Sequence, residues 1–292
     1  MASETPCTAC SWSVERQKGC SYHSNVKLFY EMSDRGVWSV GSKLIVKERS
    51  TSPPNFEARN IRLLTAKTTI PVPVITNEWS EGDRYFIVTE RIPGEPLSSV
   101  WATMSTTERV RVAKQTADYL AQLRQLTSTR IQGVDGNPVY CAFLFSGGYG
   151  VPHGPISTDD ELWDEMAQRL NGVPEKARQR LRERMPPATP YTFTHGDLTN
   201  VNIMVERGNL TGIIDWEASG YFPVWWELAC AGIGLGEEDA EWKNLLRQYM
   251  AENDDNNNDK GAVQEFYRDF HALSRYPRLN ARAEQLLCEL DS

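Results

Sequence analysis

Apolar and polar positions alternate in short runs over the first 90 residues, as they do in β-strands with one buried face. Five runs show this pattern: 26–32, 37–40, 43–47, 72–78 and 84–90. Residues 33–36 and 81–83 contain Ser, Asp and Gly, which favour turns between strands. The segment 52–55, Ser-Pro-Pro-Asn, is a helix-start signal. The pattern predicts a small antiparallel sheet with one helix.

From residue 96 onward the apolar positions recur mainly at helical spacing. Ser105 and Glu108 form a capping box in front of a long helical pattern that reaches Leu123. Further helical patterns cover 158–170, 175–185 and a run that begins near 223. Short β-prone runs stand at 192–194, 203–205 and 210–214. We therefore expect an α+β protein with a small antiparallel sheet followed by a larger, mainly helical part.

Three side chains with oxygen ligands lie among the later β-prone runs. Asp197 and Asn202 fall in the loop after 192–194, and Asp215 follows 210–214. The turn signal at 207–209 makes the last two runs a hairpin, which returns Asp215 to the side of that loop. As turn formers and caps these residues would carry no chemistry. Phosphoryl transfer from a nucleotide, however, needs a carboxylate near the acceptor hydroxyl and oxygen ligands for Mg²⁺, and we predict Asp197 for the first and Asn202 with Asp215 for the second.

Lys47 and Glu57 are predicted to form an ion pair beside the first sheet. Lys47 shares a strand face with Ile45, and Glu57 lies on the apolar stripe of the following helix with Ile61. A carboxylate that faces a core needs a partner, because an unpaired buried charge is costly. The pair would direct the Lys47 ammonium toward the α- and β-phosphates of a nucleotide. Glu48 is the competing partner, for a local ion pair.

Two motifs carry a resemblance to a known family. The segment 195–197, His-Gly-Asp, with Asn202, and the segment 214–217, Ile-Asp-Trp-Glu, resemble the aminoglycoside phosphotransferase and choline kinase branch of the protein-kinase-like fold. The stretch from 194 to about 229 is most similar to fungal members known only as phosphotransferase-family proteins. Segment 90–95, Glu-Arg-Ile-Pro-Gly-Glu, adds support.

The resemblance implies a two-lobed molecule. Its parts would be an N-lobe at 1–90, a hinge at 91–95 and a C-lobe at 96–292. Adenine is then expected to bond to backbone groups near Glu90 and Ile92. His195 taken alone could be a general base, but the resemblance implies that it holds its loop by hydrogen bonds.

The predicted activity is ATP- and Mg²⁺-dependent phosphorylation of a hydroxyl on a small molecule. The chain after Asp215 leaves no room for the regulatory segment of protein kinases, which favours an unregulated small-molecule kinase. Two alternatives stay open. The turn at 33–36 has a single glycine, Gly36, where a phosphate-binding loop has more, and this favours a nucleotide-binding pseudokinase without turnover. The other alternative is transfer of a different part of the nucleotide, such as AMP.

The acceptor is not predicted beyond its hydroxyl group. Glu227 is a candidate to bind a cationic acceptor or to form a structural ion pair. Trp225 and Trp226 would either line the acceptor site or pack in the core, and packing is favoured. Residues 133–154, rich in Gly, Pro and aromatic residues, are expected to form a loop or hairpin that could face the substrate.

The charge balance limits the partners. The chain has 31 Lys and Arg against 39 Asp and Glu, a formal net charge of −8 over 292 residues. This balance argues against a nucleic-acid-binding protein and is compatible with a cationic small substrate. An apolar run of about 18 residues is lacking, so we expect no membrane span. The start of the chain has no signal-peptide pattern, and we expect a cytoplasmic monomer or weak homodimer.

Four residues near the start of the chain have the spacing of zinc ligands. They are Cys7, Cys10, Cys20 and His23. In a reducing compartment the three cysteines would otherwise be free thiols near a frayed terminus. The sequence leaves both interpretations open.

Overall fold

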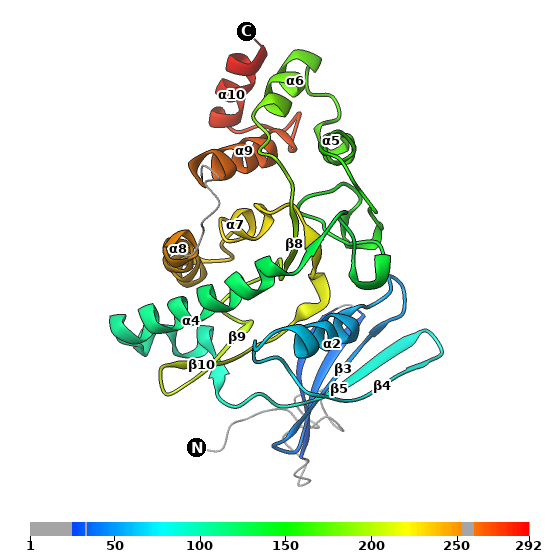
Figure 1. Cartoon of the computed structure of the whole chain (residues 1–292), viewed down its shortest axis with the longest axis vertical. Helices are drawn as coiled ribbons and strands as arrows, with labels where there is room; N and C mark the ends of the chain where they lie inside the picture. The colour runs from blue at the N-terminus through cyan, green and yellow to red at the C-terminus, as the bar shows by residue number, and fades with distance from the viewer. Residues whose placement is uncertain (1–24, 33, 253–259, 292) are drawn as a thin grey trace, which may run out of the picture.

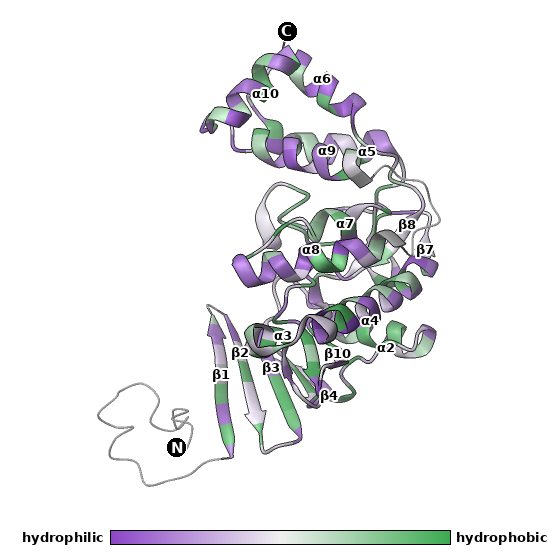
Figure 2. Cartoon of the chain, turned by 90° about the vertical axis from the view of Figure 1, so that its left-hand side faces the viewer, coloured by the Kyte–Doolittle hydropathy of each residue, from purple (hydrophilic) through white to green (hydrophobic). Residues whose placement is uncertain are grey.

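A small sheet and a larger group of helices lie one above the other along the longest axis of the molecule (Figure 1). The computed structural model describes residues 25–32, 34–252 and 260–291. The same arrangement is visible after a quarter turn, where the N-lobe sheet lies below the C-lobe helices and α3, α4 and β10 lie between them (Figure 2). The expected α+β, two-lobed architecture is confirmed, with an antiparallel N-lobe and a mainly helical C-lobe.

The N-lobe sheet has five antiparallel strands in the order β1-β2-β3-β5-β4. Their bounds are β1 Val26–Met32, β2 Arg35–Val40, β3 Leu44–Ser50, β4 Ile75–Glu81 and β5 Arg84–Glu90. Strand β3 is central, and its Lys47 pairs with Val37 on one side and Ile87 on the other. A lysine in the middle of a sheet has a backbone fixed on both sides, so its ammonium is aimed by the fold.

Strand β4 begins three residues later than the predicted start at Val72. The reason is local, because Pro71 and Pro73 lack the N–H that a ladder needs. Residues 71–74 instead run past the C-lobe, where the carbonyl of Pro71 accepts a hydrogen bond of 2.9 Å from the Ile213 amide. The correction matters for the site, because this bond joins the two lobes beside β10.

Helix α2, Glu57–Lys67, connects the sheet to the C-lobe. Ala58, Ile61 and Leu64 are its buried apolar face, as the spacing predicts. Its first turn is held by Asn55, whose Oδ1 accepts the Glu57 amide at 2.6 Å. The helix lies against the short 3-10 helix η6, Trp216–Ala218, which follows the predicted metal-binding Asp215.

The C-lobe combines helices with two three-stranded sheets. The sheets are ordered β10-β9-β6 and β11-β8-β7. Its strands are β6 Glu95–Pro96, β7 Thr127–Ser128, β8 Tyr191–Thr194, β9 Ile203–Glu206, β10 Asn209–Ile213 and β11 Gly220–Phe222. Its α-helices are α3 Leu97–Val100, α4 Thr106–Gln125, α5 Asp159–Ala167, α6 Glu175–Glu183, α7 Trp226–Cys230, α8 Glu237–Glu252, α9 Lys260–Leu273 and α10 Ala281–Asp291.

The long helix α4 begins at the predicted capping box. The Ser105 Oγ accepts the Glu108 amide at 3.3 Å, and the Glu108 carboxylate accepts the Ser105 amide at 2.9 Å.

The run predicted near Pro223 is helical only from Trp226, over five residues. Within the described part of the chain, none of the helices has the length and apolar character needed to cross a bilayer. The zinc-like residues Cys7, Cys10, Cys20 and His23 lie outside the described residues.

Candidate active site

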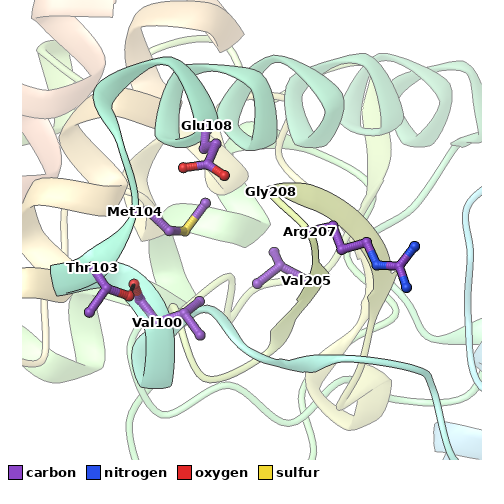
Figure 3. A pocket seen from close by; sticks show the side chains of 7 residues that line it. All are labelled: Val100, Thr103, Met104, Glu108, Val205, Arg207 and Gly208. Atoms are coloured by element: carbon purple, nitrogen blue, oxygen red, sulfur yellow. Dashed lines mark hydrogen bonds between the residues drawn. The ribbon is translucent and has the colours of Figure 1, made fainter.

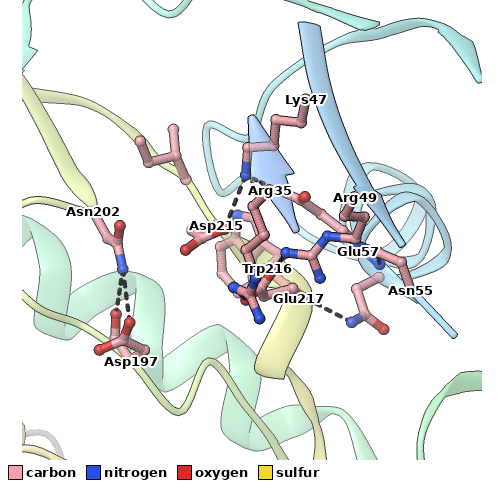
Figure 4. A network of polar contacts seen from close by, with 12 residues as sticks. Arg35, Lys47, Arg49, Asn55, Glu57, Asp197, Asn202, Asp215, Trp216 and Glu217 are labelled. Carbon is pink, nitrogen blue, oxygen red and sulfur yellow. Dashed lines mark hydrogen bonds and ion pairs between the residues drawn. The ribbon is translucent and has the colours of Figure 1, made fainter. Parts of the chain in front are cut away.

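Lys47 lies between two carboxylates where the lobes meet (Figure 4). Its ammonium is 2.7 Å from Oε1 of Glu57 and 2.9 Å from Oδ1 of Asp215. The competing partner Glu48 instead accepts from Arg84 at 2.6 Å. Burial alone would lower the pKa of Lys47, but the charges of Asp215 and Glu57 outweigh it and raise that pKa. Lys47 therefore stays an ammonium at neutral pH, held toward the C-lobe.

Asp197 and Asn202 lie at the two ends of one loop between β8 and β9. The Asn202 Nδ2 donates to the Asp197 backbone carbonyl at 2.8 Å and to its Oδ2 at 3.2 Å. The Asn202 carbonyl accepts the Ile214 amide at 3.0 Å, which places the end of the β10 segment beside the loop. The side-chain amide of Asn202 uses its nitrogen toward Asp197, and its Oδ1 points away from that carboxylate (Figure 4). An amide oxygen in this position could act as a metal ligand, which is the role predicted for Asn202.

The Asp197 carboxyl has a raised pKa of about 6. Partial burial is the largest cause, because it disfavours the charged form. The charge of Lys243 lowers the pKa, that of Asp215 raises it, and the bond from Asn202 lowers it. Asp197 is thus ionised at neutral pH with a basicity closer to that of a general base than a free Asp has.

Two buried side chains hold the backbone around Asp197. The Glu227 carboxylate accepts the amides of His195 at 2.6 Å and Gly196 at 3.3 Å. The His195 Nδ1 accepts the Asp197 amide at 3.1 Å, so its Nε2 carries the proton donated to the Ile214 carbonyl at 2.9 Å. The expected structural role of His195 agrees with these contacts. Glu227 accepts bonds from backbone amides, and its role in binding a cationic acceptor or in a structural ion pair stays a prediction.

Asp215 begins a second carboxylate cluster. It has a positive φ of 67°, an uncommon backbone conformation that Asp tolerates better than most residues. Oxygens of Glu57, Asp215 and Glu217 lie within 4.8 Å of one another. Hard carboxylate and amide oxygens are the ligands that Mg²⁺ takes, so the donor set of Asn202, Asp215 and Glu217 fits that ion. In this structure Glu57 and Asp215 both contact Lys47, and Glu217 contacts Arg35 and Arg49.

The predicted adenine-contacting residues lie where the chain leaves the N-lobe sheet. Glu90 is the last residue of β5, and Ile92 follows two residues later. The Ile92 side chain lies against β10, where a Cβ on Gly212 would meet its Cδ1 at 2.4 Å. This contact keeps Ile92 beside the hairpin that ends at Asp215. Glu90 and Ile92 therefore lie between the N-lobe sheet and the hairpin that precedes Asp215.

Figure 4 shows Lys47 and Glu57 reaching from the N-lobe toward Asp215, with Asp197 and Asn202 on the other side. Sequence reasoning missed three residues in this group, namely Arg35, Arg49 and Glu217. Arg49 shares the strand face of Ile45 and Lys47, so the same period of two would have found it. Glu217 follows Asp215 by two residues within a motif that was noted without a role.

Other residues considered for the acceptor lie elsewhere. Trp225 and Trp226 are each 1% exposed and pack as rings against Phe266 and Tyr267, which confirms the packing interpretation. Tyr149, in the segment 133–154, is half exposed. Its pKa is raised to about 12 by burial and by nearby charges that include Asp197.

A separate surface pocket lies away from this cluster (Figure 3). Its lining consists of Val100, Thr103, Met104, Glu108, Val205, Arg207 and Gly208. None of the predicted site residues belongs to it. Glu108 is already engaged in the helix cap, and the pocket has no other carboxylate.

Comparison with known proteins gives a family and several relatives. A profile of the phosphotransferase enzyme family matches residues 34–266. An aminoglycoside 3'-phosphotransferase from Acinetobacter baumannii is 23% identical over 164 residues, which are 56% of this chain and 60% of that protein. The chain thus spans less than two thirds of that relative's length.

Solved structures with a similar fold cover almost the whole chain. The ADP-bound crystal structure of aminoglycoside phosphotransferase APH(2'')-Ib has a TM-score of 0.57 at 13% identity. The match covers 94% of this chain and 93% of that protein's chain. The ternary complex of streptomycin, ATP and APH(2'')-IIa has a TM-score of 0.56 at 13% identity, covering 91% and 90%. At such identities the likeness establishes the fold.

Proposed function

Because the chain belongs to the phosphotransferase enzyme family, we propose that it transfers the terminal phosphoryl group of ATP to a hydroxyl of a small molecule. The observation that carries this proposal is the contact of Lys47 with both Glu57 and Asp215 at 2.7 and 2.9 Å. The contact with Asp215 joins the Lys47 ammonium of the N-lobe to the C-lobe hairpin, which begins directly after Asn202. Such a set positions a triphosphate and its metal ion, which is most of what this chemistry requires.

On the N-lobe side, Lys47 binds the α- and β-phosphates and Glu57 fixes its direction. Backbone groups near Glu90 and Ile92 bind the adenine, within a hinge at residues 91–95 between lobes at 1–90 and 96–292. On the C-lobe side, Asn202, Asp215 and Glu217 would hold Mg²⁺. When bound, the ion offsets the negative charge on the phosphate oxygens.

Asp197 orients the acceptor hydroxyl and accepts its proton. Its pKa of about 6 leaves it ionised at neutral pH, and the bond from Asn202 fixes one carboxylate oxygen. Glu227 and His195 keep the loop backbone in place for this step.

The acceptor class is a hydroxylated small molecule. Aminoglycosides are named in the similar structures, but three acidic side chains of the C-lobe already have partners here. Glu227 binds backbone amides, Asp239 is paired with Lys243 at 3.4 Å, and Glu217 is paired with Arg35. A cationic acceptor is therefore one member of the class rather than a requirement.

The direct test is an assay for ADP release with Mg²⁺ and a panel of hydroxylated metabolites and antibiotics. A product whose mass grows by one phosphoryl group, absent with an Asp197→Asn variant, supports the proposal. A product that grows by an adenylyl group replaces it with AMP transfer. Tight ATP binding without turnover on any acceptor points to the pseudokinase, which the single glycine in the β1–β2 segment favours.

A further inference from the structure

Two arginines of the N-lobe contact the same C-lobe carboxylate. Arg35 Nη1 lies 2.7 Å from Oε1 of Glu217, and Arg49 Nη2 contacts its Oε2. The side chains of Arg49 and Glu217 are 17% and 19% exposed, so both charges are mostly removed from water. Burial and the neighbouring Asp215 raise the pKa of Glu217 in spite of the two guanidiniums. The contacts and the network around them are drawn in Figure 4.

The sheet itself puts the two arginines together. Strands β2 and β3 are antiparallel, and Gly36 pairs with Glu48. Continuing this register by one residue places Arg35 opposite Arg49. Both side chains then extend from the sheet face that carries Lys47. Like charges side by side on adjacent strands are unfavourable unless an anion lies between them. Glu217 is that anion, and it comes from the other lobe.

The start of β2 carries an arginine and a glycine, Arg35 and Gly36. Met32, the last residue of β1, pairs with Arg35. Gly36 is explained by packing, because a Cβ at this position would meet the Trp38 ring at 2.5 Å. The phosphate-binding group at the start of β2 is therefore the guanidinium of Arg35.

The charges around Lys47 and the arginines are balanced. Glu57, Asp215 and Glu217 oppose Lys47, Arg35 and Arg49. If Glu217 turns to a divalent cation, the two guanidiniums lose their anion. Phosphate oxygens are the natural replacement, because a guanidinium binds them through two parallel hydrogen bonds.

We propose that Arg35 and Arg49 form a phosphate clamp for the terminal phosphate of ATP, and that Glu217 holds the clamp until the nucleotide binds. The proposal rests on the proposed function and adds two positioning residues to it. Lys47 then serves the inner phosphates, and the arginine pair distinguishes ATP from ADP. Without nucleotide, Glu217 contacts the two arginines. With ATP bound, Glu217 contacts the metal ion and the arginines contact the terminal phosphate.

The test compares nucleotide affinities by isothermal titration calorimetry. The variants are Arg35→Gln, Arg49→Gln and the double variant, with Arg62→Gln as a control. Arg62 is an N-lobe arginine whose side chain is 54% exposed and paired with Glu78, so the control removes the same charge away from the clamp. We expect ATP affinity to fall about tenfold or more in the clamp variants, since charged hydrogen bonds are lost. ADP affinity should change much less, and the control should match wild type.

A second experiment removes the carboxylate of Glu217 instead of the two guanidiniums. In EDTA, Glu217→Gln should bind inorganic tripolyphosphate several-fold more tightly than wild type, because Glu217 no longer competes for the guanidiniums. Thermal melts of every variant verify folding, and the exposed Arg35→Gln variant serves if the double variant is unstable.

Three outcomes decide the matter. An ATP affinity equal to that of wild type in the folded clamp variants overturns the clamp while leaving the proposed function standing. Equal weakening of ATP and ADP makes the arginines a lobe contact without phosphate specificity, which also overturns it. A wild-type protein that binds no nucleotide overturns the proposed function and the clamp together.

Discussion

At the scale of single residues, one amide connects the two tasks of the proposed site. The Asn202 Nδ2 fixes Asp197, and its Oδ1 is the atom that a metal ion would use. In the proposed mechanism the chemical step depends on Asp197, because the other groups would bind phosphate or hold the backbone. Replacing Asp197 should therefore separate catalysis from nucleotide binding.

We expect Asp197→Asn to lower turnover by about 10²-fold or more, the usual contribution of a positioned base. ATP affinity should stay close to that of wild type, because Asp197 does not contact Lys47 or Glu57. The melting temperature at neutral pH should not fall, since the variant removes a charge whose pKa burial has raised. Steady-state kinetics, titration calorimetry and thermal melts measure the three quantities. Turnover equal to wild type would remove Asp197 from the mechanism.

The pH dependence follows from the same carboxyl. Its pKa is raised to about 6, so the ionised fraction falls as the pH drops through that value. Because the base must be ionised, kcat/KM should decrease about tenfold per unit below pH 6 and level off above pH 7. ATP affinity measured over the same range separates this effect from protonation of the nucleotide. A kcat/KM that stays constant down to pH 5 would contradict the assignment.

The sequence predicts which side chains lie near one another where they belong to one continuous motif, and the roles of these residues stay predictions. Asp197, Asn202 and Asp215 share one loop and one hairpin, so short spacing was enough to bring them together. Lys47 and Glu57 followed from two periodicities and the cost of a buried charge. Arg35 and Glu217 are separated by 182 positions and come from different lobes, so neither periodicity nor motif could pair them.

At the scale of elements, a five-residue helix fixes the catalytic loop. Helix α7 places Glu227 under the amides of His195 and Gly196, and its flanking tryptophans anchor it in the C-lobe core. The sequence located the helix but not this contact, because no spacing pattern indicates that a carboxylate accepts bonds from the backbone amides of a distant loop. The later start of β4 has a different cause, because Pro71 and Pro73 lack the N–H that a strand ladder needs.

Replacing Glu227 with Ala should leave two buried amides unsatisfied. We expect a loss of about 1–3 kcal/mol in the free energy of unfolding, the range for orphaned buried donors. Turnover should fall at least tenfold with a small change in ATP affinity, since the loop that carries Asp197 loosens. Chemical denaturation and kinetics provide the readouts. Glu238→Gln, on the exposed start of α8, is the control for charge, and equal effects in the two variants would refute the positioning role.

At the scale of the whole molecule, the lobes are joined by polar contacts around the proposed site. Lys47 contacts Asp215, Arg35 and Arg49 contact Glu217, and Asn60 donates to the carbonyl groups of Trp216 and Ser219 at 2.7 and 3.2 Å. The sequence predicted both lobes, because each has its own periodicity and the motifs resemble a known fold. It could not predict how the lobes meet, since these contacts depend on three-dimensional placement.

Asn60 tests whether the contact between lobes matters for activity. The residue is fully buried on α2, and its amide links that helix to the 3-10 turn after Asp215. Asn60→Ala leaves two carbonyls without their donor, and we expect about 1–3 kcal/mol less stability. Because α2 also carries Glu57, the shift should reach Lys47 and weaken ATP binding several-fold. Lys67→Ala, at the exposed end of the same helix, should change neither quantity by much. If Asn60→Ala lowers stability while ATP affinity stays at the wild-type value, α2 is only a scaffold and the lobe junction does not set the position of the lysine.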